Sequence, residues 1–242
     1  MSKFLVGFQV LLFSAVLMAN IGTNAHAQKS LIFSKPGPLD FHAQISEDIL
    51  KEAYARIGIS VTTQEFPGER AMRESNSGRL DGEVNRIRGI EKKYTNLRIV
   101  PVAINALRGM VFSKNPRLKI QKWDDLKHYI IGLRKGAKYA EYGTAGMNVL
   151  PATTNTMVFK MLERDRVDVA ISTALEGSVT IRALGLKEVS MVEIPMVTLD
   201  LFHFLNRKHE DLIPQITRAL EAMNREGRIA EIRKKAFAKF GS

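Results

Sequence analysis

The chain of 242 residues contains no cysteine. A disulfide framework, a thiolate nucleophile and a zinc site built on cysteine are therefore excluded. Histidine is also scarce, and no pair has the i, i+4 or H-x-H spacing of a metal site: His26, His42, His128, His203 and His209. Gly132 and Gly136 are too sparse for a dinucleotide fingerprint. We therefore expect neither a metal nor a cofactor.

Long hydrophobic runs are absent beyond the N-terminus, where a bilayer span would need about 20 apolar residues. Lys3 precedes the apolar run 4–22, and an A-x-A cleavage pattern follows at Ala25–Ala27. This order predicts a signal peptide, residues 1–27, cleaved near Ala27. The alternative is a membrane anchor, which the polar residues Gln9 and Ser14 disfavour. Because no lipid-attachment cysteine follows, we expect a free protein of the bacterial periplasm.

Acidic residues are outnumbered, with 25 Asp and Glu against 36 Lys and Arg, for a net charge of +11. The basic residues are spread along the chain, without an Arg/Lys tract, zinc-finger spacing or an aromatic RNA-binding strand. Nucleic acid is therefore not an expected partner. A local excess of basic residues around a pocket would instead favour an anionic ligand.

Apolar strands alternate with amphipathic helices along the first half of the chain. Residues 31–36 and 59–66 have strand patterns, and residues 45–57 between them repeat apolar side chains at helical spacing. A short helix is predicted after Pro67, and a third strand over residues 79–84. Strand, helix, strand, helix, strand is typical of a doubly wound parallel sheet.

The second half repeats this α/β pattern between two long extended runs, 98–115 and 199–209. It includes a predicted strand over 188–196, and two amphipathic helices, 212–223 and 229–240, close the chain. Two α/β units joined by two extended segments indicate a two-lobed α/β protein with a two-segment hinge. The crossings are predicted near Ile104–Met110 and Asp200–Asn206. Lobe 1 would then comprise residues 28–107 plus 202–242, and lobe 2 residues 108–201. A single doubly wound domain is the alternative.

Five segments together resemble the extracellular solute-binding proteins of family 3, the type II periplasmic binding proteins that serve polar amino acid ABC importers. In chain order they are SGRLDGEVNRIRG (77–89), VPVAINALRGMVFSKN (100–115), LKHYIIGLRKGAKYAEY (126–142), MLERDRVDVAIST (161–173) and LFHFLNRKHEDLIPQITRALEAMNREGRIAEI (201–232). The resemblance covers nearly the whole predicted mature chain and implies two doubly wound lobes that close around a small polar solute. It also implies that Asp81 and Asp168 are structural.

Two positions depart from the ligand clamp that this resemblance implies. Lys93 stands where the amino acid subset of the family has its carboxylate-binding Arg, and Thr173 where it has the carboxylate that holds the α-ammonium. A plain α-amino acid is therefore disfavoured as the ligand. Arg86 stands where the family usually has a small residue, and a planar Arg fork binds carboxylate or phosphate well. The full set of predicted ligand-binding residues is Arg86, Arg70, Arg134, Glu83, Asn85, Tyr139, Ser172 and Thr173.

The leading hypothesis is a monomeric periplasmic protein that captures a small polar, anionic or carboxylate-bearing solute for an ABC importer. The alternatives are a sensory partner of a membrane kinase or cyclase, and a dehydratase-like enzyme on the same scaffold. We expect no enzymatic activity, because the Asp81/Glu83 pair does not form a rigid catalytic platform around Gly82. Replacing Arg86 by Ala is expected to change the stability of the free protein by no more than about 1 kcal/mol, as for a surface side chain.

Overall fold

The computed structural model describes residues 29–36 and 40–240. The predicted signal peptide, residues 1–27, lies outside this part of the chain. Within the described part, no helix is both long and apolar enough to cross a membrane.

The first lobe is built on the predicted alternation of strands and helices. Its elements are β1 (Ser30–Lys35), α1 (Phe41–Ala55), β2 (Ser60–Glu65), α2 (Gly68–Asn76) and β3 (Gly82–Ile87). β1 pairs in parallel with β2 on one side and with β3 on the other. Helix α1 begins at Asp40, whose carboxylate accepts a hydrogen bond from the backbone of Ala43 at 2.9 Å. The predicted helix start at residue 45 is thus four residues late.

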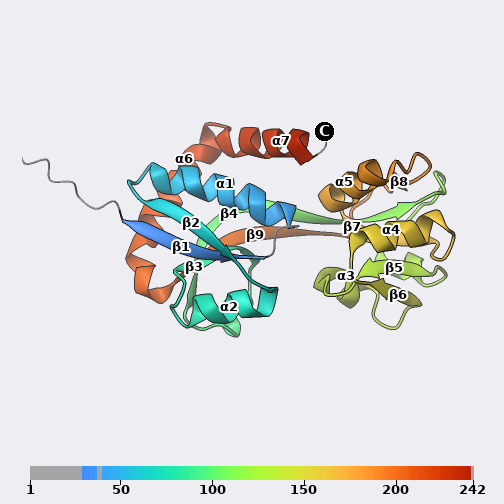
Figure 1. The fold of residues 1–242 in the computed structure, drawn as a ribbon, viewed down its shortest axis with the longest axis horizontal. Helices are drawn as coiled ribbons and strands as arrows, with labels where there is room; N and C mark the ends of the chain where they lie inside the picture. The colour runs from blue at the N-terminus through green and yellow to red at the C-terminus, as the bar shows by residue number, and fades with distance from the viewer. Residues whose placement is uncertain (1–28, 37–39, 241–242) are drawn as a thin grey trace, which may run out of the picture.

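Two long strands run through both lobes, as Figure 1 shows: β4 (Leu97–Ser113) and β9 (Val197–Asn206). They pair antiparallel over most of their length. Near one end β9 also pairs with β3, and near the other end β4 pairs with β7 (Val169–Thr173). Between these two regions, around Leu107 and Leu199, β4 and β9 are the only described strands that pair. One sheet, in the order β2-β1-β3-β9-β4-β7-β5-β6, therefore continues from lobe to lobe through a two-stranded ribbon. The exact lobe boundaries remain a prediction.

The second lobe has parallel pairing around β5 (Ile131–Arg134), which lies between β6 (Val149–Ala152) and β7. Its helices are α3 (Lys138–Gly143), α4 (Asn155–Glu163) and α5 (Ala174–Leu184), with the short 3-10 turn η2 (Trp123–Leu126). The strand predicted over 188–196 shrinks to β8 (Ser190–Met191). Beyond it, Val192 and Met196 still donate single backbone hydrogen bonds to β4, and Pro195, which lacks a backbone donor, cannot add one between them.

After β9 has returned the chain to lobe 1, it forms η3 (Arg207–Leu212), α6 (Ile213–Arg225) and α7 (Arg228–Phe240). Helices α6 and α7 lie close to their predicted positions. Lobe 1 also contains the short turn η1 (Ile90–Lys92). Helices α6 and α7 lie beside α1 over the main core of lobe 1, which includes the fully buried side chains of Phe33 and Tyr54. Two further clusters, around Phe159 and Leu126, fill lobe 2. Each lobe thus has its own core, and Leu175 of α5 in lobe 2 also packs into the core of lobe 1.

Two aspartates fix equivalent turns in the two lobes. Asp81 accepts a hydrogen bond from the backbone of Ile32 at 2.7 Å, and Asp168 accepts one from the backbone of Ile130 at 2.6 Å. Each ties the loop before one strand to the start of a neighbouring strand. The structural role that the resemblance implied for both residues agrees with these contacts.

Candidate functional site

A cavity of about 240 Å³ lies where the two lobes face each other across the ribbon. Its walls come from the start of α1 and the end of β3 in lobe 1, and from β5, α3 and α5 in lobe 2. The lining residues are Asp40, His42, Asn85, Arg86, Ile87, Leu107, Arg134, Gly136, Ala137, Lys138, Tyr139, Thr173, Glu176, Leu199 and Leu201. The lining includes five of the eight predicted ligand-binding residues: Arg86, Arg134, Asn85, Tyr139 and Thr173.

In lobe 1, Arg86 is held by an acidic residue behind it. Glu83 is completely buried, and its Oε2 lies 2.9 Å from Nη2 of Arg86. Neither atom has a partner in hydrogen-bond geometry within the described part of the chain, so the contact is an ion pair without strong directionality. Ser34 donates a hydrogen bond to the other carboxylate oxygen. Burial raises the pKa of Glu83 to about 7, although Arg86 opposes the shift. Glu83 therefore anchors Arg86 and does not itself line the cavity.

The local backbone explains how Glu83 and Arg86 come to adjoin. The pairing of β3 with β9 shifts register between these two residues, as at a β-bulge, which re-aims side chains. Just before it, Gly82 lies so close to β9 that a Cβ there would sit 2.1 Å from the carbonyl oxygen of Phe204. The glycine thus permits the close backbone approach that the sequence indicated.

In lobe 2, Arg134 ends strand β5 and its Nη2 lies 3.9 Å from Oε1 of Glu176. Glu176 belongs to the first turn of α5, where Thr173 caps the helix by accepting a hydrogen bond from the backbone of Glu176 at 3.1 Å. Burial raises the pKa of Glu176, Arg134 opposes this shift, and Asp40 of lobe 1 adds to it. Burial likewise raises the pKa of Tyr139, which packs over Gly109. A carboxylate of lobe 1, Asp40, therefore affects the pKa of a carboxylate of lobe 2, Glu176.

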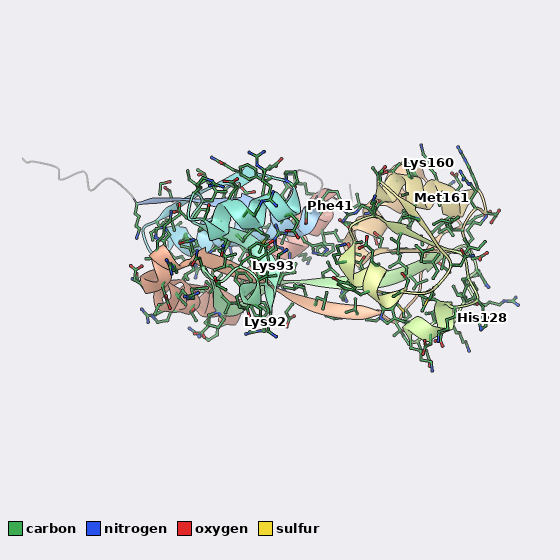
Figure 2. The ribbon with its side chains drawn as sticks, turned by 90° about the horizontal axis from the view of Figure 1, so that it is seen from below. Phe41, Lys92, Lys93, His128, Lys160 and Met161 are labelled. Atoms are coloured by element: carbon green, nitrogen blue, oxygen red, sulfur yellow. The ribbon has the colours of Figure 1, made fainter. Side chains whose placement is uncertain are left out.

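Three predicted ligand-binding residues lie outside the cavity lining. Glu83 is buried behind Arg86, and Ser172 is buried in β7 with no hydrogen-bond partner for its hydroxyl among the described residues. Arg70 is exposed on α2, where its guanidinium stacks over Phe66 at 5.0 Å. Lys93, expected at the surface, is exposed and pairs with Glu69 at 3.4 Å (Figure 2).

Among the residues of the cavity wall that are absent from the predicted set are Asp40, His42 and Glu176. Asp40 was detectable as the helix cap before an apolar-periodic run. Thr173 and Glu176 have the T-x-x-E spacing of a capping box, which marks a helix start. No local sequence pattern marks His42 as a residue of the cavity wall. With Asp40 and Glu176 included, the cavity holds both signs of charge, because Arg86, Arg134 and Lys138 face two carboxylates.

The arrangement also bears on the stability expected for Arg86→Ala. The side chain of Arg86 is only 19% exposed, and its partner Glu83 is fully buried. Removing one member of a buried pair leaves the other charge uncompensated. We therefore expect a larger loss than the roughly 1 kcal/mol typical of a surface substitution.

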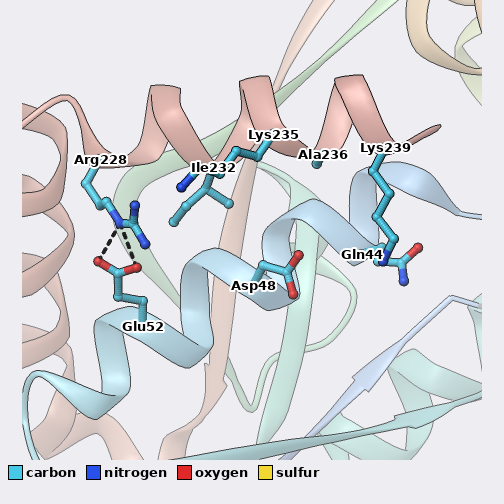
Figure 3. A pocket seen from close by; sticks show the side chains of 8 residues that line it. All are labelled: Gln44, Asp48, Glu52, Arg228, Ile232, Lys235, Ala236 and Lys239. Atoms are coloured by element: carbon cyan, nitrogen blue, oxygen red, sulfur yellow. Dashed lines mark hydrogen bonds and ion pairs between the residues drawn. The ribbon is translucent and has the colours of Figure 1, made fainter. Parts of the chain in front are cut away.

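A second crevice, of about 330 Å³, lies between α1 and α7, away from the ribbon (Figure 3). Nε of Arg228 bridges both carboxylate oxygens of Glu52 at 3.0 and 2.8 Å at one end. Its remaining walls are helix side chains of one lobe, of which Ile232 and Ala236 are buried. Although larger, this crevice lacks the convergence of two lobes, so the interlobe cavity is the candidate site. The described residues hold no group of histidines and carboxylates that could bind a metal.

Comparison with known proteins identifies the fold. The sequence matches no protein-family model. It is 22% identical to an uncharacterised protein of Shewanella oneidensis over 209 residues, covering 83% of this chain and 78% of the other.

Three solved structures superpose on most of the chain. The ligand-binding core of GluR0 in complex with L-glutamate gives a TM-score of 0.72 at 12% identity, covering 87% of this chain and 99% of that one. A histidine kinase sensor domain similar to periplasmic binding proteins gives 0.68 at 14%, with coverages of 86% and 96%. A substrate-binding protein of an amino acid ABC transporter from Streptococcus pneumoniae, bound to L-arginine, gives 0.68 at 10%, with coverages of 89% and 98%. The predicted two-lobed type II periplasmic-binding-protein fold is therefore confirmed.

Proposed function

We propose that this chain is a periplasmic solute-binding protein that captures a small carboxylate-bearing solute between its lobes and delivers it to an ABC importer. The observation that carries the proposal is the presence of Arg86 from lobe 1 and Arg134 from lobe 2 in one interlobe cavity. An anion between them gains two charge-assisted contacts only when the lobes come together. Ligand affinity and lobe closure are then coupled, which is what a transporter needs to recognise the loaded state.

The helix starts around the cavity support an anionic ligand further. Helices α1 and α5 both begin at residues that line it, Asp40 and Thr173. The N-terminal end of a helix carries a partial positive charge, which adds to that of the two arginines. The cavity volume of about 240 Å³ suits a solute of modest size.

Thermal-shift screening tests this function. Carboxylates, phosphorylated metabolites and amino acids are added to protein purified without refolding. A carboxylate at about 100 times its Kd should add about 2.7 kcal/mol of stability, which corresponds to a Tm increase of roughly 5–10 °C for a protein of this size. The Arg134→Ala variant should lose this increase, because its side chain is 40% exposed and its removal disturbs the free protein little.

Arg117→Ala is the matched control, since Arg117 is exposed in lobe 2 and lies outside the cavity. It should keep the full ligand response. A screen in which no carboxylate stabilises the protein, or in which Arg134→Ala responds like Arg117→Ala, would contradict the proposal.

A sensory role is the second candidate, favoured by the similarity to the histidine kinase sensor domain. Deleting the gene separates the two roles. Loss of uptake of the stabilising solute identifies an import protein, whereas intact uptake with a lost transcriptional response identifies a sensory one. We propose no enzymatic role: Asp81 is bound by the backbone of Ile32 and by His209, and Glu83 is held by Ser34 and Arg86 outside the cavity lining.

A further inference from the structure

His42 is a buried polar side chain in the cavity wall with nothing to bind. It lies in the first turn of α1, is 7% exposed, and neither ring nitrogen has a hydrogen-bond partner in the described chain. Its backbone is fixed, because its carbonyl oxygen accepts a hydrogen bond from Asn105 of strand β4 at 3.2 Å. The ring is therefore held at the cavity by its main chain while its nitrogens remain unpaired.

Leaving a buried polar group unpaired costs about 1–3 kcal/mol, and His42 has two such atoms. Groups of this kind in native structures call for an explanation, and a missing ligand is one that fits a residue lining a cavity. Burial lowers the pKa of His42 and Asp40 opposes the shift. At neutral pH the ring is uncharged and offers one donor and one acceptor nitrogen.

Two acceptor carboxylates, Asp40 and Glu176, line the same cavity as His42. Asp40 is two residues from His42 on the chain and interacts electrostatically with both His42 and Glu176. Asp40 already accepts the capping hydrogen bond of α1, and Glu176 is largely buried with Arg134 as its nearest cation, 3.9 Å away. Two carboxylates and a neutral imidazole together favour a ligand group that donates hydrogen bonds.

We propose that His42 and Glu176 form a donor-binding subsite, so that the solute carries a hydroxyl or amino group in addition to its carboxylate. The proposal rests on the proposed function, in which Arg86 and Arg134 bind the carboxylate. Recognition by hydrogen bonds at both ends gives high selectivity, because a site built for a donor rejects the analogue that lacks it.

Calorimetric titration of matched compounds tests the subsite. One set is propionate, lactate and alanine, and a longer set is butyrate, 4-hydroxybutyrate and 4-aminobutyrate. Within at least one set, the hydroxyl or amino member should bind the wild type at least tenfold more tightly than the plain acid. The variant His42→Phe should reduce this ratio about tenfold, and His42→Asn should restore part of it. Glu176→Gln should weaken the binding of amino compounds more than that of hydroxyl compounds. This difference identifies which group of the solute donates the hydrogen bond.

Three controls make the outcomes distinct. His128→Phe, at an exposed position of lobe 2 (Figure 2), should leave every ratio unchanged. If the plain acids bind as tightly as the substituted ones and their binding requires Arg134, the subsite proposal is wrong and the proposed function stands. The same holds if His42→Phe weakens all members of a set equally, as a purely structural change would. Failure of every compound to bind the wild type would overturn both.

Discussion

The buried carboxylate of Glu83 should make the protein lose stability as the pH rises. Its folded-state pKa is raised from 4.5 to about 7 by burial, although Arg86 opposes the shift. Between these two values the folded protein keeps a proton that the unfolded chain has released. The free energy of unfolding therefore falls by about 1.4 kcal/mol per pH unit over this interval, or about 3 kcal/mol in all. The fully buried position of Glu83 means that solvent does not screen this effect.

The variant Glu83→Gln isolates the effect, because Gln has nearly the same shape and does not titrate. Urea denaturation of wild type and variant is measured at constant ionic strength between pH 4.5 and 8. The variant should gain about 3 kcal/mol relative to the wild type across this range, since all other titrations cancel in the difference. Glu188→Gln, at an exposed position, is the control and should show a flat difference. A Glu83→Gln difference that stays constant within about 1 kcal/mol would refute the reasoning.

Two further predictions follow from the same strand. Gly82→Ala should destabilise the protein by more than about 3 kcal/mol, because the new Cβ would meet the backbone oxygen of Phe204 at 2.1 Å. Gly68→Ala is the control and should change the free energy of unfolding little, because open space surrounds Gly68. Equal urea midpoints for the two variants would contradict the predicted clash at Gly82. Binding of the tightest carboxylate should strengthen up to about tenfold from pH 8 to pH 6, because protonated Glu83 no longer neutralises Arg86. Calorimetry of Glu83→Gln should show no such change, and a wild type with pH-independent affinity would exclude the link.

Much of the fold was predictable because its signals are local. The parallel strands β1 and β2, the helix α1 between them and the closing helices α6 and α7 all follow from apolar periodicity. The strand over 188–196 was wrong and the strand β6 was missed, because short segments carry too few periods to be recognised. The long strands β4 and β9 were visible as extended runs, whereas their antiparallel pairing is seen only in the tertiary structure.

The candidate site was predictable only in part. Arg86 and Arg134 stood out as basic residues near strand ends, and both line the interlobe cavity. Ser172 was placed from sequence position alone and lies outside it, since a shift of one residue along a strand turns a side chain to the other face. Arg70 also lies outside it, exposed on helix α2 beside Phe66. Glu83 was expected near the ligand, and its complete burial behind Arg86 depends on neighbours from three other elements, which no sequence pattern specifies.

The sequence by itself determined the alternation of strands and helices, the absence of cysteine chemistry and the two extended runs that join the lobes, because composition and periodicity act over a few neighbouring residues. Only the tertiary structure decided which charges share the cavity. Asp40 and Glu176 lie 136 positions apart in the chain, and each looks like a helix-start residue when taken alone. Lobe-to-lobe packing brings them to one cavity wall with His42, whose buried ring has no partner among the described residues, since burial and electrostatics depend on distance in space.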